Sequence, residues 1–268
     1  MTPLTVVCWK WSASLSIPGH LRNRASVAAI PTDNWVTHIA VNRLYRMLQE
    51  HLSGRWELVC ITDNPSRILP EVRVVPLPHL HPDPGYLYRR LWLFSKNARV
   101  LIGERVLALD LDIVIRRNIT HMARRTEPLV IWRRPYLRKD YWDCSVMLLS
   151  PGQFSEVWDD FDPVLSPVTV DADNLSNTDS SWIWRKLGET PAAFKTPEVI
   201  PYAGVCDAPR TEPPESASII AFNRGRRPWT RGEGAYRRWL IQSYLDLPDV
   251  RPTHDHPAND GWRNKEHV

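Results

Sequence analysis

The sequence has no long apolar run. No stretch of it approaches the roughly 18 consecutive apolar residues of a membrane-spanning helix, which argues against an integral membrane protein. The first residues, MTPLTVVCWKWSASL, also lack the basic start, the apolar stretch and the small-residue cleavage site of a secretory signal peptide. We therefore expect a cytoplasmic protein.

Cysteine is scarce and scattered. The 268 residues include four cysteines, Cys8, Cys60, Cys144 and Cys206, with no Cys-x-x-Cys pair and no histidine at zinc-finger spacing. This pattern disfavours both a structural zinc site and a disulfide framework. Cys8 and Cys60 lie inside apolar runs, where a free cysteine usually behaves as a small buried hydrophobic residue. A reducing compartment is consistent with this use of cysteine.

Lysine is rare, whereas arginine is abundant. Six of the 34 basic residues are lysines and 28 are arginines, and the formal net charge is +4. Arginine binds carboxylates and phosphates in a bidentate manner, but a GC-rich genome would produce the same bias, so only clustering is informative. Residues 116–139 and 224–238 hold eight and six basic residues, against one acidic residue in each segment. Such segments are typical of a surface that meets a polyanion, or they are simply solvated.

Length and hydrophobic periodicity predict an α/β fold. Short β-branched runs at 4–9 and 56–62 predict buried strands, and apolar residues at helical spacing predict an amphipathic helix that follows Thr37. This alternation indicates a mainly parallel, twisted, Rossmann-like sheet flanked by helices. We expect one domain over 1–247, with an irregular C-terminal lobe, and a loosely ordered tail over 248–268. Further strands are expected near 72–75 and over 106–115, 129–132, 145–149 and 218–222, and further helices near 87–94 and over 152–161, 180–187 and 234–244.

Two aspartates flank Leu111 in the apolar run RVLALDLDIVI. In one extended strand over 106–115, alternate side chains share a face, so Asp110 and Asp112 would emerge together at the end of a buried strand. Burying two carboxylates without a partner is costly, so a cation must compensate. That cation is either one of the many arginines or a divalent metal, for which oxygen ligands suit Mg²⁺ or Mn²⁺.

Further motifs accompany this aspartate pair in a fixed order. VVCWKW, VNRLY, LVCITDNP and Arg90-Leu-Trp-Leu-Phe94 precede LALDLDIVI, and DCSVMLL, DSSWI and IIAFNRGRRPW follow it. Together, over roughly residues 4–229, they resemble the nucleotide-sugar glycosyltransferases of the GT-A fold. The similarity is to the glycogenin-like and lipopolysaccharide-galactosyltransferase-like family eight and its bacterial and phage relatives. We therefore expect a GT-A fold.

The resemblance implies a donor site with a metal. It places Asp110, Asp112 and Asn223 on Mn²⁺ or Mg²⁺, and it places Asp143 and Asp179 beside the sugar as candidate catalytic residues. If the reaction inverts, either aspartate could act as a base on the acceptor. If it retains, as the family implies, they orient the sugar and stabilise a cationic transition state. The candidate residues for binding the nucleotide and its diphosphate are Lys10, Trp11, Thr62, Asp63, Arg90, Asp110 and Arg227.

Three positions depart from the family motifs. Where the family has a metal-ligating histidine, this chain has Ala221 in one register and Asn223 in the other. Asp143 replaces an asparagine, and Ser180 replaces the glutamine after Asp179. The amide oxygen of Asn223 could still bind a hard cation. The third metal ligand and the sugar preference therefore stay open, as does a turn-capping role for Asp63.

These features predict a metal-dependent transfer of a sugar, with a UDP-sugar favoured, to an acceptor hydroxyl. A glycan is the favoured acceptor. The basic segments 116–139 and 224–238 leave open a phage-type enzyme that acts on a hydroxylated base in DNA, which would have to be flipped out of the duplex. Because the family motifs are altered, a nucleotide-sugar binding module that has lost catalysis is a further alternative.

Overall fold

The computed structural model describes most of the chain up to residue 222. The described residues are 3–11, 37–78, 88–133, 142–173, 178–202 and 213–222, with Pro228, Leu240 and Tyr244. Asn223, Arg227, the segment 224–238 apart from Pro228, the helix expected over 234–244 apart from two single residues, and the tail 248–268 lie outside them.

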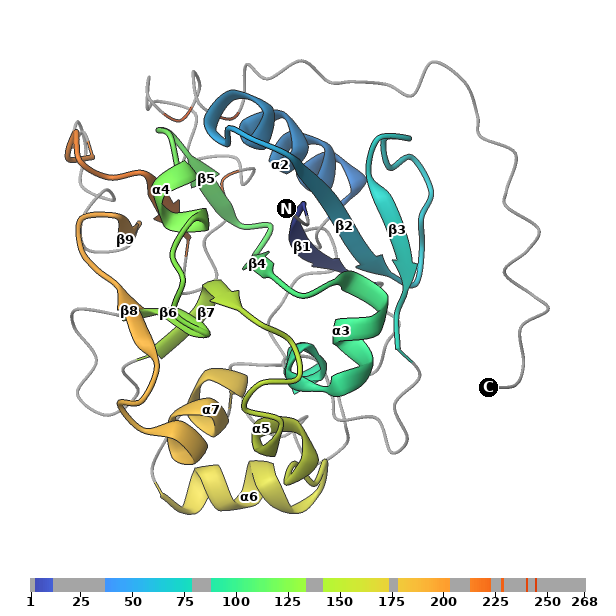
Figure 1. Ribbon diagram of the computed structural model, residues 1–268, viewed down its shortest axis with the longest axis vertical. Helices are drawn as coiled ribbons and strands as arrows, with labels where there is room; N and C mark the ends of the chain where they lie inside the picture. Colours follow the sequence, from blue (N-terminus) through green and yellow to red (C-terminus); the bar gives the residue numbers. More distant parts are fainter. Residues whose placement is uncertain are drawn as a thin grey trace.

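Seven strands form the central sheet (Figure 1). Their order across the sheet is β3-β2-β1-β4-β7-β6-β8. From β3 to β4 the neighbours run parallel, β7 is antiparallel to both β4 and β6, and β8 is parallel to β6. The mainly parallel sheet predicted from the sequence is therefore confirmed. The strands are β1 (Leu4–Lys10), β2 (Trp56–Thr62), β3 (Arg73–Pro76), β4 (Val106–Leu109), β6 (Leu129–Arg133), β7 (Trp142–Leu149) and β8 (Ala192–Phe194).

The chain changes its direction of travel across the sheet at β1. Strands β1, β2 and β3 follow one another toward one edge, and the chain then returns to place β4 on the other side of β1. In open parallel sheets, ligands bind in the crevice at the carboxyl ends of two such strands. In this protein Lys10 ends β1 and Asp110 directly follows β4, so these two residues lie at the carboxyl ends where such a crevice is expected.

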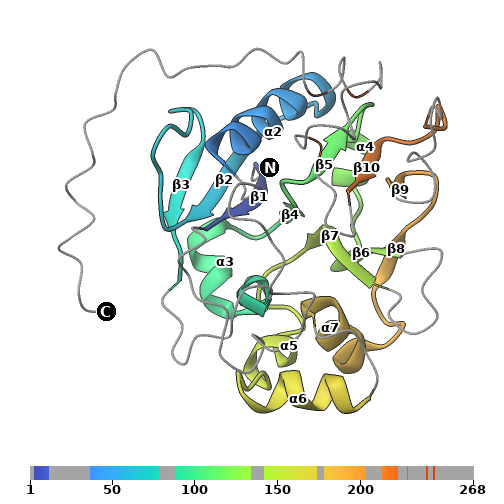
Figure 2. The same ribbon diagram turned by 180° about the vertical axis from the view of Figure 1, so that it is seen from behind.

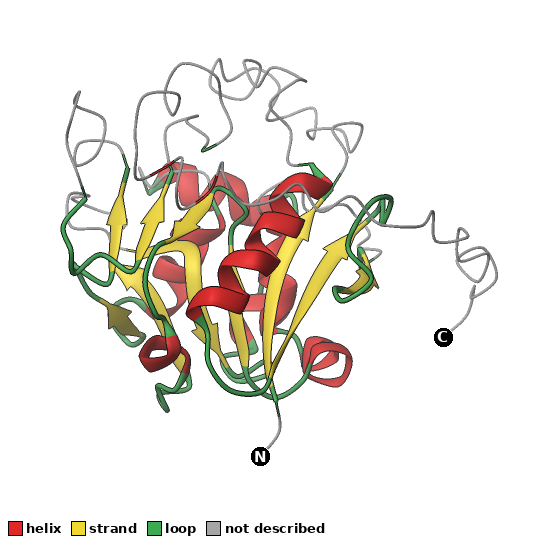
Figure 3. Cartoon of the chain, turned by 90° about the horizontal axis from the view of Figure 1, so that it is seen from above, coloured by secondary structure: helices red, strands yellow, loops and turns green. Residues whose placement is uncertain are grey.

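Helices cover both faces of the sheet (Figures 2 and 3). On one face, Val41, Leu44 and Leu48 of α2 (His38–His51) pack into a core with Leu107 and Leu109 of β4. On the other face, Val106 and Ala108 join a second core with residues from several short helices. The alternation of side chains along β4 thus supplies both cores. These helices are η3 (Tyr88–Phe94), α3 (Lys96–Ile102), α5 (Glu156–Asp159), α6 (Leu165–Ala172) and α7 (Asp179–Leu187).

A second, three-stranded sheet begins where the aspartate pair ends. Its order is β5-β10-β9, with β5 (Ile113–Ile115) antiparallel to β10 (Ile219–Ala221) and β9 (Val199–Pro201) parallel to β10. The prediction of a single strand over 106–115 is therefore wrong. Asp110–Asp112 interrupts it, so that β4 belongs to the seven-stranded sheet and β5 to the three-stranded sheet. Both halves are buried on their own sheets, which explains why the run is apolar throughout.

Most other elements match their predictions, with three kinds of difference. The helix expected near 87–94 is the 3-10 helix η3, followed by the α-helix α3. The helix expected over 152–161 is shortened to α5, because turns occupy its first residues. The elements α4 (Thr120–Ala123), α6, β8 and β9 were not predicted. In the described part of the chain, no helix is long and apolar enough to cross a membrane.

Candidate functional site

An arginine joins two aspartates at the carboxyl end of β4. The guanidinium of Arg90, from η3, donates through Nε to Asp179 Oδ2 at 2.7 Å and through Nη2 to Asp179 Oδ1 at 3.1 Å. Its Nη1 donates to Asp110 Oδ1, just after β4. Three segments that are distant in the sequence therefore meet at this guanidinium, one before β4, one after it and one at the start of α7.

This cluster is shielded from water to different degrees. The side chains of Asp179, Arg90 and Asp110 are 1%, 13% and 26% exposed. Burial raises the pKa of the Asp179 carboxyl, and the Arg90 guanidinium opposes that rise. Burial alone would lower the pKa of Arg90, but Asp110 and Asp179 outweigh it and hold the pKa well above its ordinary value. The cation is therefore permanent, and the exposed side of the cluster is Asp110.

Helix α7 begins at the cluster in a way that fixes Asp179. Thr178 is the N-cap, and its side chain accepts a hydrogen bond from Ser181 N at 3.3 Å. Asp179 Oδ1 also accepts from Ser180 N at 2.9 Å. A carboxylate in the first turn is favoured by the helix dipole. Asp179 therefore combines a role in starting the helix with the bidentate contact to Arg90, and the N-cap residue is Thr178.

The neighbouring strand β7 adds a third carboxylate. Its pairing with β6 shifts in register between Ile131 and Trp132, so that Trp132 lies opposite Asp143. Asp143 Oδ1 accepts from Ser145 N at 2.8 Å, and Ser145 O accepts from Asp110 N at 2.9 Å. Cys144 N donates to Ser180 Oγ at 3.2 Å. The irregular segment 143–145 thus connects the end of β4 to the start of α7.

The charges that act on Cys144 are further evidence that the segment 143–145 lies close to Arg90 and Asp179. Burial raises the pKa of the Cys144 thiol well above its ordinary value, and the charges of Asp179, Arg90 and Asp143 all act on it. A buried thiol with a raised pKa is unreactive as a nucleophile. Cys144 is therefore a small side chain within the site rather than a reactive group.

Asp112 lies on the other side of Leu111 and meets different elements. Its carbonyl oxygen accepts from Phe222 N at 2.9 Å, which ties it to the end of β10. Its charge also acts on the pKa of Tyr244, which burial raises. The extended strand from which Asp110 and Asp112 were expected to project together does not form, because Asp110–Asp112 lies between two strands of different sheets. The turn brings β10, which precedes Asn223, to the aspartate pair.

The end of β1 carries a buried lysine. Lys10 is 8% exposed, and its Nζ donates to Asn64 O at 2.6 Å. Thr62, which lies opposite Lys10 in the register of β1 and β2, accepts from Asn64 N at 3.0 Å. Burial lowers the pKa of Lys10, and the charge of Asp63 is among those that oppose this. The structure therefore brings Lys10, Thr62 and Asp63 together, and it places Trp11 in edge contact with Trp9.

The side chains of Asp110 and Asp112 are chemically suited to bind a divalent cation. Asp110 and Asp112 offer carboxylate oxygens, which Mg²⁺ and Mn²⁺ prefer, and Mg²⁺ commonly uses one or two carboxylates with substrate phosphates and water. Among the residues that the structure describes, no group of three His, Cys, Asp or Glu side chains could hold a metal. Ala221 pairs with Ile113 inside a buried strand, so its register offers no ligand. The other candidate, Asn223, lies outside the described residues.

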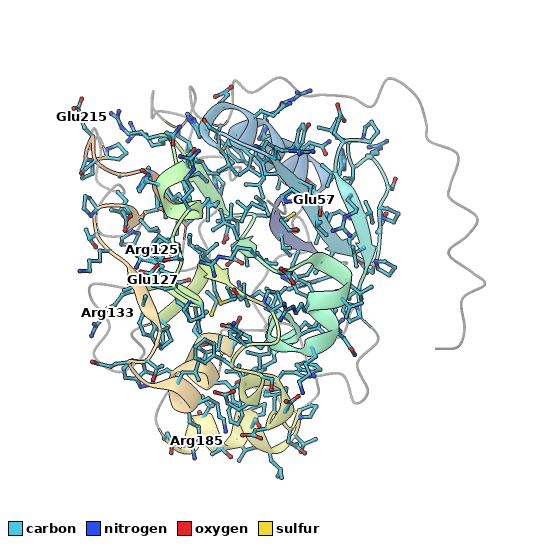
Figure 4. All side chains as sticks on the ribbon, in the orientation of Figure 1. Glu57, Arg125, Glu127, Arg133, Arg185 and Glu215 are labelled. Carbon is cyan, nitrogen blue, oxygen red and sulfur yellow. The ribbon has the colours of Figure 1, made fainter. Side chains whose placement is uncertain are left out.

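Two arginines of the basic segment 116–139, Arg125 and Arg133, pair with acidic side chains of the same chain, and Figure 4 labels Arg125 beside Glu127. Arg125 pairs with Glu127 and donates through Nη1 to Ala193 O at 2.7 Å. This pairing lowers the pKa of Glu127 to about 2. Arg133 pairs with Glu189 at 3.3 Å. These contacts neutralise part of the positive charge that the sequence alone shows.

Sequence reasoning named most of the residues described above, but not their contacts. It assigned Arg90 to the donor diphosphate, whereas the structure shows it bound to Asp110 and Asp179. It missed Ser145, Asn64 and Tyr244. The only signal for Asn64 was its place in the turn TDNP after a buried strand, and no sequence pattern pointed to Tyr244.

Solved structures with a similar fold are glycosyltransferases. The glycosyltransferase GlyE of Streptococcus pneumoniae TIGR4 matches with a TM-score of 0.56 and 11% identity over 89% of this chain. The active-site mutant Q189E of LgtC matches with a TM-score of 0.56 and 14% identity, over 91% of this chain and 97% of LgtC. The galactosyltransferase LgtC in complex with donor and acceptor sugar analogs matches with a TM-score of 0.53 and 12% identity, over the same shares of the two chains.

These matches fix the fold. The chain spans 60% of the length of GlyE. No family model and no curated protein matches the sequence. The α/β architecture of this chain is that of the GT-A glycosyltransferases, as its motifs predicted.

Proposed function

We propose that this protein is a glycosyltransferase that moves a sugar from a nucleoside-diphosphate sugar, with UDP favoured, to an acceptor hydroxyl. The observation that carries the proposal is the cluster of Arg90, Asp110 and Asp179 beside the crevice at the carboxyl ends of β1 and β4. Ligand sites of open α/β sheets lie at this position. The fold shared with GlyE and LgtC supports the same reaction class.

The diphosphate is the group that most needs positive charge. Breaking the bond between the sugar and the diphosphate leaves negative charge on the phosphate oxygens, and an enzyme must stabilise that charge as it develops. Lys10 provides a partly desolvated ammonium at the end of β1. Asp110 and Asp112, with Asn223, would hold Mn²⁺ or Mg²⁺, which supplies a Lewis acid for the diphosphate when bound.

Asp179 and Asp143 would face the sugar. Arg90 holds Asp179 through two hydrogen bonds, so the carboxylate has a fixed position and direction. A fixed carboxylate can orient a sugar hydroxyl and stabilise the positive charge of an oxocarbenium-like transition state. Retention of configuration, which the family resemblance implies, is consistent with this role. A saccharide hydroxyl is the proposed acceptor, and the complex of LgtC with donor and acceptor sugar analogs supports a sugar on both sides of the reaction.

Turnover with and without a metal tests the proposal. UDP-, GDP- and CDP-sugars would be screened for hydrolysis and transfer with Mn²⁺ and with a chelator. We expect the chelator to abolish turnover. We expect Asp112→Asn to lower kcat/KM by about a hundredfold or more, as the loss of one charge-stabilising group does. The control Asp159→Asn changes an exposed aspartate of α5 and should match the wild type.

The outcomes separate the alternatives. Wild-type turnover in chelator, or an Asp112→Asn enzyme as fast as the wild type, would contradict the role of the metal. A protein that is stabilised by a donor in a thermal-shift assay, but that never turns it over, is a binding module. Saturating a site at 100 times its Kd stabilises the native state by about 2.7 kcal/mol, which such an assay detects.

A further inference from the structure

The two aspartates that share the guanidinium are also connected through β7. Asp110 N donates to Ser145 O at 2.9 Å. One residue earlier in β7, Cys144 N donates to Ser180 Oγ at 3.2 Å. Ser180 follows Asp179 in α7, and its own N donates to Asp179 Oδ1 at 2.9 Å. Together with the contacts of the guanidinium to both carboxylates, these bonds close a hydrogen-bonded ring. The members of the ring are Arg90, Asp110, Ser145, Cys144, Ser180 and Asp179.

An irregularity of β7 explains why the ring needs Ser180. The pairing of β7 with β6 skips residues 144–146, because the register shifts between Ile131 and Trp132. Cys144 is 3% exposed, and a buried backbone N–H requires an acceptor. Irregular pairing of this kind is common beside active sites, where it changes the direction of side chains. The hydroxyl of Ser180 accepts the hydrogen bond that β6 does not.

The link through Ser180 differs in kind from the link through Arg90. Arg90 joins two side chains, and it does so from the end of a long side chain with many rotamers. Ser180 instead joins the backbone of β7 to the first turn of α7 through a single short side chain. Asp143 belongs to the segment so held, since its Oδ1 accepts from Ser145 N at 2.8 Å.

We propose that Ser180 is a positioning residue for sugar transfer, which holds the segment 143–145 against α7 so that Asp143 and Asp179 keep a fixed relation to each other. This inference rests on the proposed function, in which these two aspartates face the sugar. Ser180 carries no charge and acts through the backbone of Cys144. A displacement of about 1 Å in a reacting site can lower the rate by about a hundredfold, so a small loss of alignment is measurable.

Steady-state kinetics with the donor that the wild type turns over test the proposal. Ser180→Ala removes the acceptor of Cys144 N. We expect kcat to fall by about tenfold or more while the donor KM changes by less than about twofold, because alignment acts in the transition state. Ser180→Thr keeps the hydroxyl and should retain most of kcat.

Ser166→Ala is the matched control. Ser166 lies in α6, outside the ring, and its Oγ accepts from Asp162 N at 2.9 Å. The control therefore loses the same type of bond, from a backbone N–H to a serine hydroxyl. We expect it to keep the kcat of the wild type.

Amide hydrogen exchange, followed by NMR, tests the ring without turnover. In Ser180→Ala we expect the amide of Cys144 to exchange about fivefold faster, which corresponds to one ordinary hydrogen bond. The amide of Asp110, bonded to the next residue of β7, should also exchange faster if the ring opens as a unit. Both amides should keep their wild-type rates in Ser166→Ala.

Each result has a defined meaning. Wild-type kcat in Ser180→Ala, an equal fall in Ser166→Ala, or a Ser180→Thr enzyme as slow as Ser180→Ala overturns the positioning role and leaves the proposed function standing. A faster Cys144 amide with an unchanged Asp110 amide overturns the coupling around the ring. A wild type that turns over no donor overturns the proposed function, and the role of Ser180 in transfer with it, even where exchange shows the ring to be coupled.

Discussion

Arg90 compensates the buried carboxylate of Asp179 and the partly buried carboxylate of Asp110. Asp179 is almost fully buried, and a bidentate guanidinium is the side chain best able to compensate such a group. Breaking a buried pair by removing one partner is strongly destabilising, because the other charge stays in the interior. The same arginine also donates a hydrogen bond to Asp110, which follows β4. The stability of the fold and the proposed function therefore both involve Arg90.

Replacement of this arginine should be costly. We expect Arg90→Met to lower the free energy of unfolding by about 3–5 kcal/mol, because Asp110 and Asp179 lose their cation. Urea unfolding at pH 7 measures the change. The double variant Arg90→Met with Asp179→Asn should recover part of the loss, since it removes the more buried of the two charges.

A surface pair provides the control. Arg99 pairs with Glu104 at 2.7 Å, but their side chains are 53% and 63% exposed. We expect Arg99→Met to cost less than about 1 kcal/mol, as is usual for exposed ion pairs. If Arg90→Met and Arg99→Met cost the same, the buried cluster contributes no more than a surface contact, and its role in stability is refuted.

At the scale of elements, the sequence predicts those helices and strands that have a clear hydrophobic periodicity. The helix α2 follows Thr37 as predicted, because its apolar residues repeat at helical spacing, and β2 coincides with the predicted run 56–62. The break at Asp110–Asp112 was not predictable from periodicity, since both flanking segments are equally apolar and buried. The strands β8 and β9 have three residues each, too few for a pattern to register. Tertiary pairing, not local sequence, defines them.

The start of α7 links an element to the site. Because Thr178 caps the helix and Asp179 is its first residue, loss of the cap should loosen Asp179 as well as the helix. We expect Thr178→Ala to cost about 1 kcal/mol, the usual cost of losing a threonine cap, and to lower kcat of the proposed reaction more than it changes the donor KM. Urea unfolding and steady-state kinetics measure the two effects.

A comparable change elsewhere separates stability from positioning. Asn118 accepts from Thr120 N at 2.9 Å at the start of α4, away from the Arg90 cluster. Asn118→Ala should reduce stability by a similar amount while leaving kcat at the wild-type value. An equal loss of kcat in both variants would show that kcat follows overall stability, and would refute the specific role of the Thr178 cap.

At the scale of the whole molecule, the topology brings the site residues together. The residues come from five separate segments, and the strand order, η3 and α7 bring these segments to the carboxyl ends of β1 and β4. They are Lys10, Arg90, Asp110, Asp143 and Asp179. The motifs identified these residues one by one, and the resemblance supplied a common site. Neither could show that Arg90 binds two of the aspartates, because the sequence order of residues carries no distances.

The charge of the whole molecule bears on whether the acceptor is DNA. The net charge is only +4, and Arg125 and Arg133 are paired with Glu127 and Glu189. We expect binding to a 20-base-pair duplex to involve fewer than about three phosphates, so the affinity should fall by less than about a hundredfold between 50 and 200 mM salt. Fluorescence anisotropy of labelled DNA over this range measures the slope.

Releasing the paired arginines tests the reason for this expectation. The double variant Glu127→Gln with Glu189→Gln removes the carboxylate partners of Arg125 and Arg133. It should therefore steepen the salt dependence of DNA binding by the slope of up to about two phosphate contacts. A wild-type slope that corresponds to six or more phosphates would contradict the expectation. In that case DNA would replace a saccharide as the leading acceptor. The phosphates would then be bound by basic side chains other than the paired Arg125 and Arg133.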